Sequence, residues 1–138
     1  MKNIEKILPT AIKVIKESKE DKAILNDKGE VPKEFNGYIS SLGASIIMSG
    51  LLPTMVFFSQ AGKSKGNRTT VIFAIENILN QAFPDILYKE KNLLKTVEDM
   101  VKNNKDMQRL QDKIQLAAIA LKLAIRIFPK SKEESNHE

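Results

Sequence analysis

Hydrophobic residues recur along most of the chain at intervals of three and four positions, the spacing of one face of an α-helix. The first stripe lies within residues 4–15, and lysine, glutamate and threonine occupy the other faces. Pro9 falls inside this stripe, so the helix is expected either to begin close to Pro9 or to kink there. Sustained alternation with a period of two, which would indicate strands, is nearly absent. The pattern therefore predicts an all-α protein.

The same spacing, with the turn signals between stripes, predicts a single compact bundle of about five to six helices. Pro32 suits the first position of the second helix, and Gly50 suits its end. Pro53 fits the opening of a short third helix, and Thr69 or Thr70 can cap the fourth. The stripes after the first lie within residues 35–49, 53–60, 71–83, 93–101 and 106–128.

The bundle is expected to form one domain, residues 1–129, followed by a disordered polar tail, residues 130–138. A length of 138 residues is that of one domain with room for a hydrophobic core. Its 42% of hydrophobic and 28% of charged residues are ordinary for a folded soluble protein. The chain has no cysteine, which excludes disulfides and thiolate metal sites.

A long stretch without charge, residues 36–62, raises the possibility of a membrane span. Residues 38–58 are long enough to cross a bilayer. The interruption at residues 50–53, however, breaks the run into two helices that are each too short, so no membrane association is expected. The small residues of its first half can instead allow close helix packing inside a soluble protein: Gly37, Ser41, Gly43 and Ala44. Because lysine and glutamate are spread through the N-terminal segment, it is not a signal peptide, and a cytoplasmic location is expected.

The second half of the final helix is apolar almost all round. Leu116, Leu123 and Ile127 fall outside its broad apolar face, while Lys122 and Arg126 occupy the one polar strip. Such a helix is either central in a bundle or half-covered by another protein. Leu116, Leu123 and Ile127 are therefore candidate protein-interface residues.

The net charge of +5 is distributed unevenly. No carboxylate lies between Glu34 and Glu76, and the only charges in that interval are Lys63, Lys65 and Arg68. A basic segment without competing carboxylates suggests that nucleic acid, or another anionic surface, is the partner. A solvated loop explains the same residues equally well.

Two further basic pairs lie on the final helix, each one turn apart: Arg109 with Lys113, and Lys122 with Arg126. By their angular positions the pairs face nearly opposite ways, so they cannot form one stripe. Aromatic residues are few, and none clearly interleaves the basic loop, which argues against a platform for stacking bases. Contact with a phosphate backbone, without sequence reading, fits these residues best.

The sequence contains no motif that indicates a catalytic site. Gly62-Lys63-Ser64 resembles the end of a phosphate-binding loop, but Phe57 stands where that motif needs its first glycine, and the segment is helical. The single histidine, His137, lies in the polar tail. No metal-ligand spacing and no arrangement of nucleophile and base occurs. The protein is therefore predicted to be no enzyme and to need no cofactor or metal.

Residues 37–58, GYISSLGASIIMSGLLPTMVFF, resemble the small α-helical subunit of type III-B CRISPR effector complexes, the fifth protein of the Cmr module. The likeness rests on a Tyr followed by Ser-Ser-Leu-Gly-Ala, a Ser-Gly-Leu-Leu-Pro junction and a short apolar helix that ends in aromatics. The length and the helical plan agree over the whole chain.

The resemblance implies a non-catalytic subunit that stacks in copies beside the crRNA-bearing filament and contacts the guide–target RNA. Its partners would be the other Cmr subunits, crRNA, target RNA and further copies of itself. No catalytic motif transfers, and the RNA contacts expected at the basic residues rest on local charge. Two alternatives stay open: a helical interaction or regulatory adaptor with incidental basic patches, and peripheral membrane attachment through residues 38–58.

Overall fold

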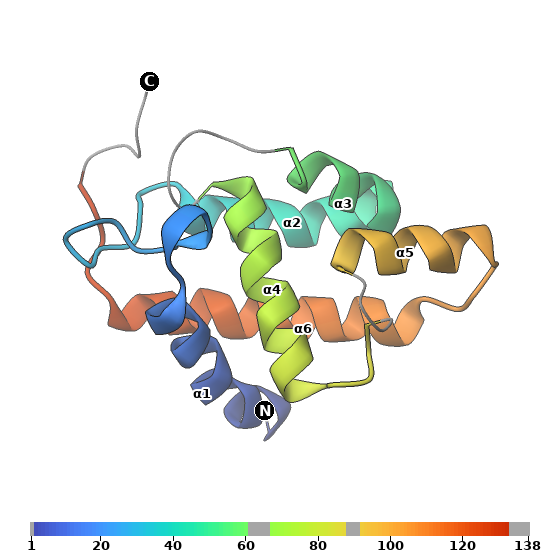
Figure 1. Ribbon diagram of the computed structural model, residues 1–138, viewed down its shortest axis with the longest axis horizontal. Helices are drawn as coiled ribbons and strands as arrows, with labels where there is room; N and C mark the ends of the chain where they lie inside the picture. Colours follow the sequence, from blue (N-terminus) through green and yellow to red (C-terminus); the bar gives the residue numbers. More distant parts are fainter. Residues whose placement is uncertain (1, 61–66, 88–91, 133–138) are drawn as a thin grey trace.

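The computed structural model describes residues 2–60, 67–87 and 92–132, and these form six α-helices and two short 3₁₀ helices (Figure 1). In chain order they are α1 (Lys2–Glu17), η1 (Glu20–Lys22), α2 (Phe35–Ser49), α3 (Leu51–Phe58), α4 (Arg68–Ala82), α5 (Leu93–Lys102), α6 (Gln108–Ala124) and η2 (Ile125–Ile127). The only β-type pairing of the described residues is an isolated parallel bridge between Val31 and Lys130. The prediction of an all-α bundle is confirmed.

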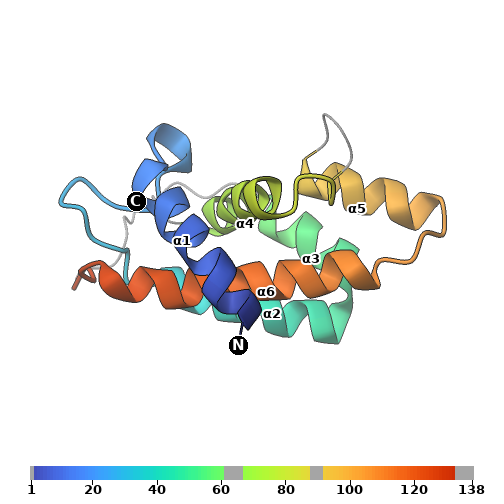
Figure 2. The same cartoon turned by 90° about the horizontal axis from the view of Figure 1, so that it is seen from below.

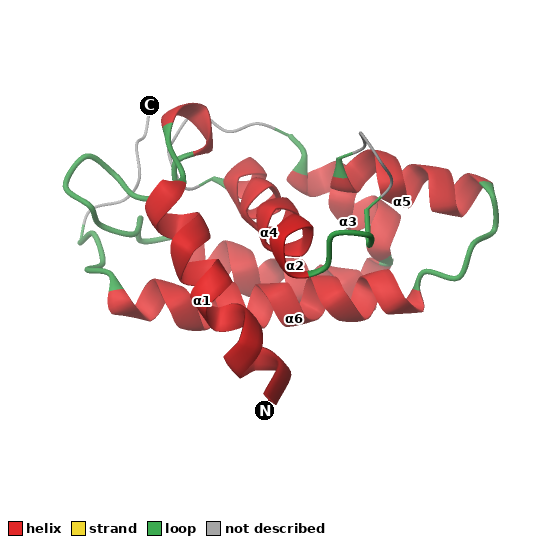
Figure 3. Cartoon of the chain, turned by 60° about the horizontal axis from the view of Figure 1, so that its bottom comes forward, coloured by secondary structure: helices red, strands yellow, loops and turns green. Residues whose placement is uncertain are grey.

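The helices form two layers (Figures 1 and 2). In one, α2 and α6 lie side by side and run along the long axis in opposite directions. The other contains α1 and α4, which pack against each other and against α6, and α4 also crosses α2. Beyond α4, α5 packs on α3 (Figure 3). The final helix α6 is thus central, because α1, α2 and α4 all pack against it.

The predicted break in the uncharged stretch is confirmed at Gly50. Its backbone has a φ of 96°, a left-handed value that glycine adopts without steric cost, and its N–H closes α2 on the carbonyl of Ile46 at 3.0 Å. Pro53 lies in the first turn of α3, where its missing N–H leaves no hydrogen bond unmade. The Thr54 hydroxyl donates to the Gly50 carbonyl at 2.8 Å. Among the described residues, no helix has the length and apolar character that crossing a bilayer requires.

Two helix starts differ from those predicted. The cap of α4 is Asn67, not Thr69 or Thr70, because the Asn67 side chain accepts the backbone N–H of Thr70 at 3.1 Å. The second helix begins at Phe35 instead of Pro32, whose carbonyl accepts the N–H of Phe35 at 3.1 Å in a preceding turn.

The first helix also differs: it begins at Lys2 and runs through the exposed Pro9, so the expected start close to Pro9 is wrong.

The core is built from one apolar stripe of each helix. Phe35, Ile39, Leu42 and Ile46 of α2 are at most 2% exposed. Opposite them on α6, Leu110, Ile114, Ala117 and Leu121 are at most 2% exposed. The alanines of α6 let neighbouring helices approach closely, which explains how α1, α2 and α4 can share one central helix.

The small residues of α2 are not in this core. Gly37, Ser41 and Ala44 are exposed, and only Gly43 is half-buried, where an added Cβ would lie 3.3 Å from the side-chain oxygen of Gln115. The prediction that they allow packing inside the protein is wrong for the three exposed residues. They lie across the helix from the buried stripe, on a face that no described helix covers.

Candidate nucleic-acid interface

Arg68 is the member of the predicted basic loop that the structure places, since Lys63 and Lys65 lie outside the described residues. It is the first residue of α4, directly after the Asn67 cap. The first turn of a helix presents unpaired N–H groups and the positive end of the helix dipole. Arg68 therefore adds a full positive charge to a position that already favours anions.

The guanidinium of Arg68 lies over the ring of Phe57, 4.4 Å from its centroid. Phe57 is 48% exposed at the end of α3, and its ring meets Phe58 edge-on with centroids 5.7 Å apart. Sequence reasoning missed this aromatic partner. The contact brings together residues on two different helices, which spacing along the chain does not reveal.

Within the described residues, the buried Nε of Arg68 has no hydrogen-bond partner. A buried donor without an acceptor carries a desolvation cost. Stacking on Phe57 holds the guanidinium plane in place, but it gives that N–H no acceptor.

The basic pairs of α6 diverge, as the sequence predicts. Lys113 lies over the Phe83 ring, with its Nζ 4.7 Å from the centroid, beside the end of α4. Lys122 donates from Nζ to the Ser40 hydroxyl of α2 at 2.6 Å. Arg109 and Arg126 are exposed near opposite ends of the α6–η2 segment. The structure therefore does not gather the five predicted basic residues that it describes into one site.

The interface residues predicted near the end of the chain differ in how far they are buried. Leu116 is half-buried and packs against the core, Leu123 is half-buried, and Ile127 is 61% exposed. Larger exposures occur where α2 meets α3. There Ile47 is 78% exposed and Met48 is 84% exposed.

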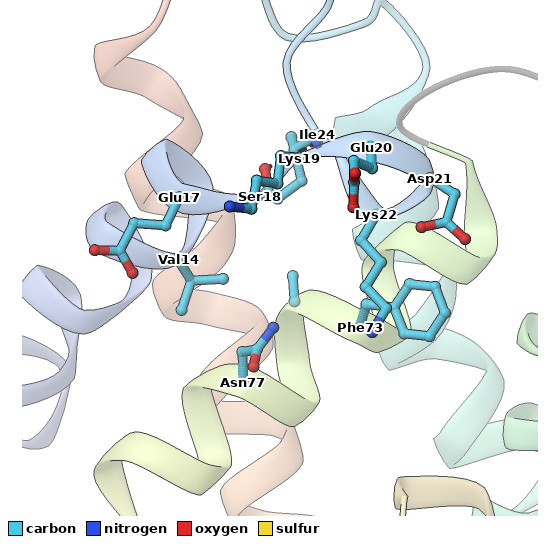
Figure 4. A pocket seen from close by; sticks show the side chains of 11 residues that line it. Val14, Glu17, Ser18, Lys19, Glu20, Asp21, Lys22, Ile24, Phe73 and Asn77 are labelled. Atoms are coloured by element: carbon cyan, nitrogen blue, oxygen red, sulfur yellow. Dashed lines mark hydrogen bonds between the residues drawn. The ribbon is translucent and has the colours of Figure 1, made fainter.

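A cavity of about 330 Å³ lies between the end of α1, η1 and α4 (Figure 4). The Lys22 side chain extends toward Phe73, with its Nζ 4.9 Å from the centroid of the ring, while Asn77 points up from α4. The Ser18 hydroxyl donates to the Ile15 carbonyl at 2.8 Å and accepts the Ile24 N–H at 3.0 Å. It thus holds a turn and is not poised as a nucleophile. Among the described residues, no group of His, Asp and Glu could hold a metal ion.

Glu76 of α4 is a half-buried carboxylate. Burial raises its pKa above the ordinary value of 4.5, and two weaker influences oppose the shift: a hydrogen bond from the Leu93 N–H at 2.8 Å and the charge of Lys22. Because this hydrogen bond joins α4 to the first residue of α5, Glu76 has a structural role.

The family of the chain follows from a comparison with known protein families. The family model for the CRISPR-associated protein (Cas_Cmr5) matches residues 5–122. The chain belongs to this family. Comparison with curated proteins and with solved structures gives no match.

Membership of the Cas_Cmr5 family makes the chain a CRISPR-associated Cmr subunit and confirms the resemblance that residues 37–58 indicate. The matched span takes in Arg68, Phe57 and the exposed apolar residues of α2. Arg126, Ile127 and the segment that pairs with Val31 lie beyond it.

Proposed function

We propose that this Cmr subunit is non-catalytic, stacks with further copies and other subunits beside the crRNA-bearing filament, and contacts the guide–target RNA through basic residues. The observation that carries the RNA contact is Arg68, whose guanidinium lies over the Phe57 ring at the start of α4. A planar guanidinium suits phosphate oxygens, which it can bind through two N–H groups at once.

The contact is to the backbone, without sequence reading. Positive charge and a helix N-terminus both favour a phosphate. Lys63 and Lys65 stand close to Arg68 in the sequence and extend the basic character of the segment. Backbone contact suits a guide-based system, because base pairing between guide and target already reads the sequence.

Stacking is supported by large apolar side chains that stay exposed near the junction of two helices: Ile47 and Met48 of α2, and Val56 of α3. Association with another protein would remove such side chains from water. Of the three interface residues predicted from the sequence, Ile127 is the most exposed and is the strongest candidate for such a contact. Leu116 and Leu123 contribute less, since both are half-buried.

The test is the affinity of reconstituted Cmr complex for target RNA, measured over a range of salt concentrations. Arg68→Gln, alone and combined with Lys63→Gln and Lys65→Gln, should lower the affinity. The magnitude of the salt slope should fall by about 0.7–0.9 for each phosphate that the variant no longer binds. Arg68→Lys keeps the charge but not the planar stack, so it should give an intermediate affinity.

A matched control removes three exposed lysines elsewhere: Lys13, Lys16 and Lys105. Replacing these with glutamine changes the net charge as much as the triple variant does. Equal affinity and slope for wild type, triple variant and control would favour the adaptor reading, in which the basic patches are incidental. RNA or ATP turnover that survives repurification of the isolated protein would contradict the non-catalytic role.

A further inference from the structure

A second basic site lies at the end of the molecule where the segment after α6 meets the loop before α2 (Figure 1). A cavity of about 220 Å³ there is lined by Lys28, Glu30, Lys130, Ser131 and Lys132. We call it the lysine pocket. Three lysines and one carboxylate line it, so its formal charge is +2. Lys130 and Lys132 belong to the stretch predicted as a disordered tail, the rest of which lies outside the described residues.

Backbone pairing brings the two halves of the lysine pocket together. The N–H of Val31 donates to the Pro129 carbonyl at 2.8 Å, and the N–H of Ser131 donates to the Val31 carbonyl at 2.9 Å. Val31 is 1% exposed and anchors this bridge in the core. Lys28 and Lys130, far apart in the sequence, therefore line the same cavity by virtue of the fold.

The loop that carries Lys28 is also internally fixed. The Asn26 side-chain oxygen accepts the N–H groups of Lys28 and Glu30, both at 2.9 Å, and Gly29 has a φ of 76° that favours glycine. The Asn26 amide donates to a carboxylate oxygen of Glu30 at 3.0 Å. The one carboxylate of the pocket is thus engaged by Asn26. Within the described residues, no ion pair engages Lys28, Lys130 or Lys132.

The pocket has the size and the chemistry for one protruding anionic group. Its volume is below the roughly 300–1,000 Å³ of sites that enclose small molecules. Lysine acts as a compact point charge with three donors, which suits a phosphate approached from several sides. No described aromatic residue lines the cavity, so it has no surface on which a base could stack.

We infer that the lysine pocket binds a phosphodiester group of RNA, as a backbone contact separate from Arg68. This inference rests on the proposed function, because it assigns a further part of the RNA path to the same subunit. The site tracks the backbone and adds affinity without sequence preference.

The experiment compares reconstituted complexes that contain the wild-type chain, the variant K28Q/K130Q/K132Q or the charge-matched control K13Q/K16Q/K105Q. The readout is the salt slope of target-RNA binding, together with the melting temperature of each free chain. The pocket variant should reduce the slope by about 0.7–0.9 for each phosphate it fails to bind, while the control leaves the slope unchanged. Both variants should melt as the wild type does.

Complex assembled without the subunit distinguishes failure of the proposed function from failure of the inference. If its omission leaves affinity and slope unchanged, the proposed function fails and the inference fails with it. If omission weakens binding while the pocket variant behaves as the control, the inference alone is overturned.

Two further outcomes would assign the pocket to another ligand. Saturable binding of inorganic phosphate to the free chain that the pocket variant abolishes, with RNA binding unchanged, would identify a small free anion. Absence of the pocket variant from the complex, with the control retained, would identify an acidic protein surface. Either result overturns the assignment to RNA.

Discussion

Helices α1 and α2 are nearly equal in length, 16 and 15 residues, and each buries one apolar stripe, yet their outer faces have little in common. Exposed positions of α1 carry lysine and glutamate, as at Glu5, Lys13 and Lys16. Exposed positions of α2 carry no charge at all, and they include Ile47 and Met48. A charged outer face is suited to water, whereas an uncharged face with large apolar side chains is suited to another protein. The two outer faces therefore differ in what is expected to cover them, water on α1 and another protein on α2.

The largest effects are expected where the two helices are alike, at their buried stripes. Phe35→Ala in α2 should lower the free energy of unfolding by about 3–5 kcal/mol, and Ile15→Ala in α1 by about 2–5 kcal/mol, because both side chains are fully buried. Urea unfolding of the free chain measures both. A decrease below about 0.5 kcal/mol at either position would mean that the stripe is not part of the core.

The outer faces should differ in assembly and not in stability. Met48→Glu and its counterpart Lys13→Glu should each change the stability of the free chain by no more than about 0.5 kcal/mol. Met48→Glu should weaken stacking or incorporation into the complex by about 2 kcal/mol, roughly 30-fold, because it places a charge in an apolar contact. Lys13→Glu should leave assembly unchanged. Equal behaviour of the two variants in a sedimentation or pull-down titration would remove the distinction between the faces.

A smaller effect tests whether α2 is uncovered in the free chain. An added Cβ at Gly37 would have no atom within 4 Å. Gly37→Ala should therefore raise the stability of the free chain by about 0.4–1 kcal/mol, since alanine restricts the unfolded chain without meeting a neighbour. The reverse change at exposed Ala44, Ala44→Gly, should lower stability by about 0.5–1 kcal/mol. Thermal or urea unfolding that shows Gly37→Ala to be destabilising would mean that another part of the protein covers this face.

The smallest effect concerns a carboxylate that is turned inward, unlike the exposed carboxylates of α1. Because burial raises the pKa of Glu76 in the folded state, the folded protein keeps this proton to a higher pH than the unfolded chain does. Its contribution to stability is therefore greatest at low pH, falls as the pH rises from 4.5 through the folded pKa, and is constant above it. Glu76→Gln keeps an acceptor for the Leu93 N–H but has no charge. The stability of wild type relative to Glu76→Gln should thus decline as the pH rises above 4.5, and a rise would contradict the shift.

Much of the fold follows from local pattern. The buried stripes and the break at Gly50 are predictable because each depends on residues within one or two turns. The outer face of α2 is not predictable in the same way, since glycine, serine and alanine fit a close-packed helix contact and an uncovered surface equally well. The Asn67 cap was missed because Thr69 and Thr70 offer a hydroxyl oxygen that can accept the same kind of hydrogen bond.

The candidate site was less accessible to sequence reasoning. Arg68 was identified by its charge, but its partner Phe57 lies on another helix and emerges only when α3 and α4 are placed. The lysine pocket was missed for a similar reason. Lys130 and Lys132 fall in a polar stretch typical of a tail, and only backbone pairing with Val31 brings them beside Lys28.

The packing of α1 against α6 bears on how the chain folds as it is synthesised. The ribosome delivers α1 first, but the helix that covers much of its apolar stripe is the last of the six to emerge. Until α6 emerges, the apolar stripe of α1 lacks part of its native surroundings, so the nascent chain exposes apolar surface. Contacts of such long sequence separation also slow folding, because a long loop must close before they form. A chaperone that shields apolar helices during synthesis should therefore raise the yield of folded protein.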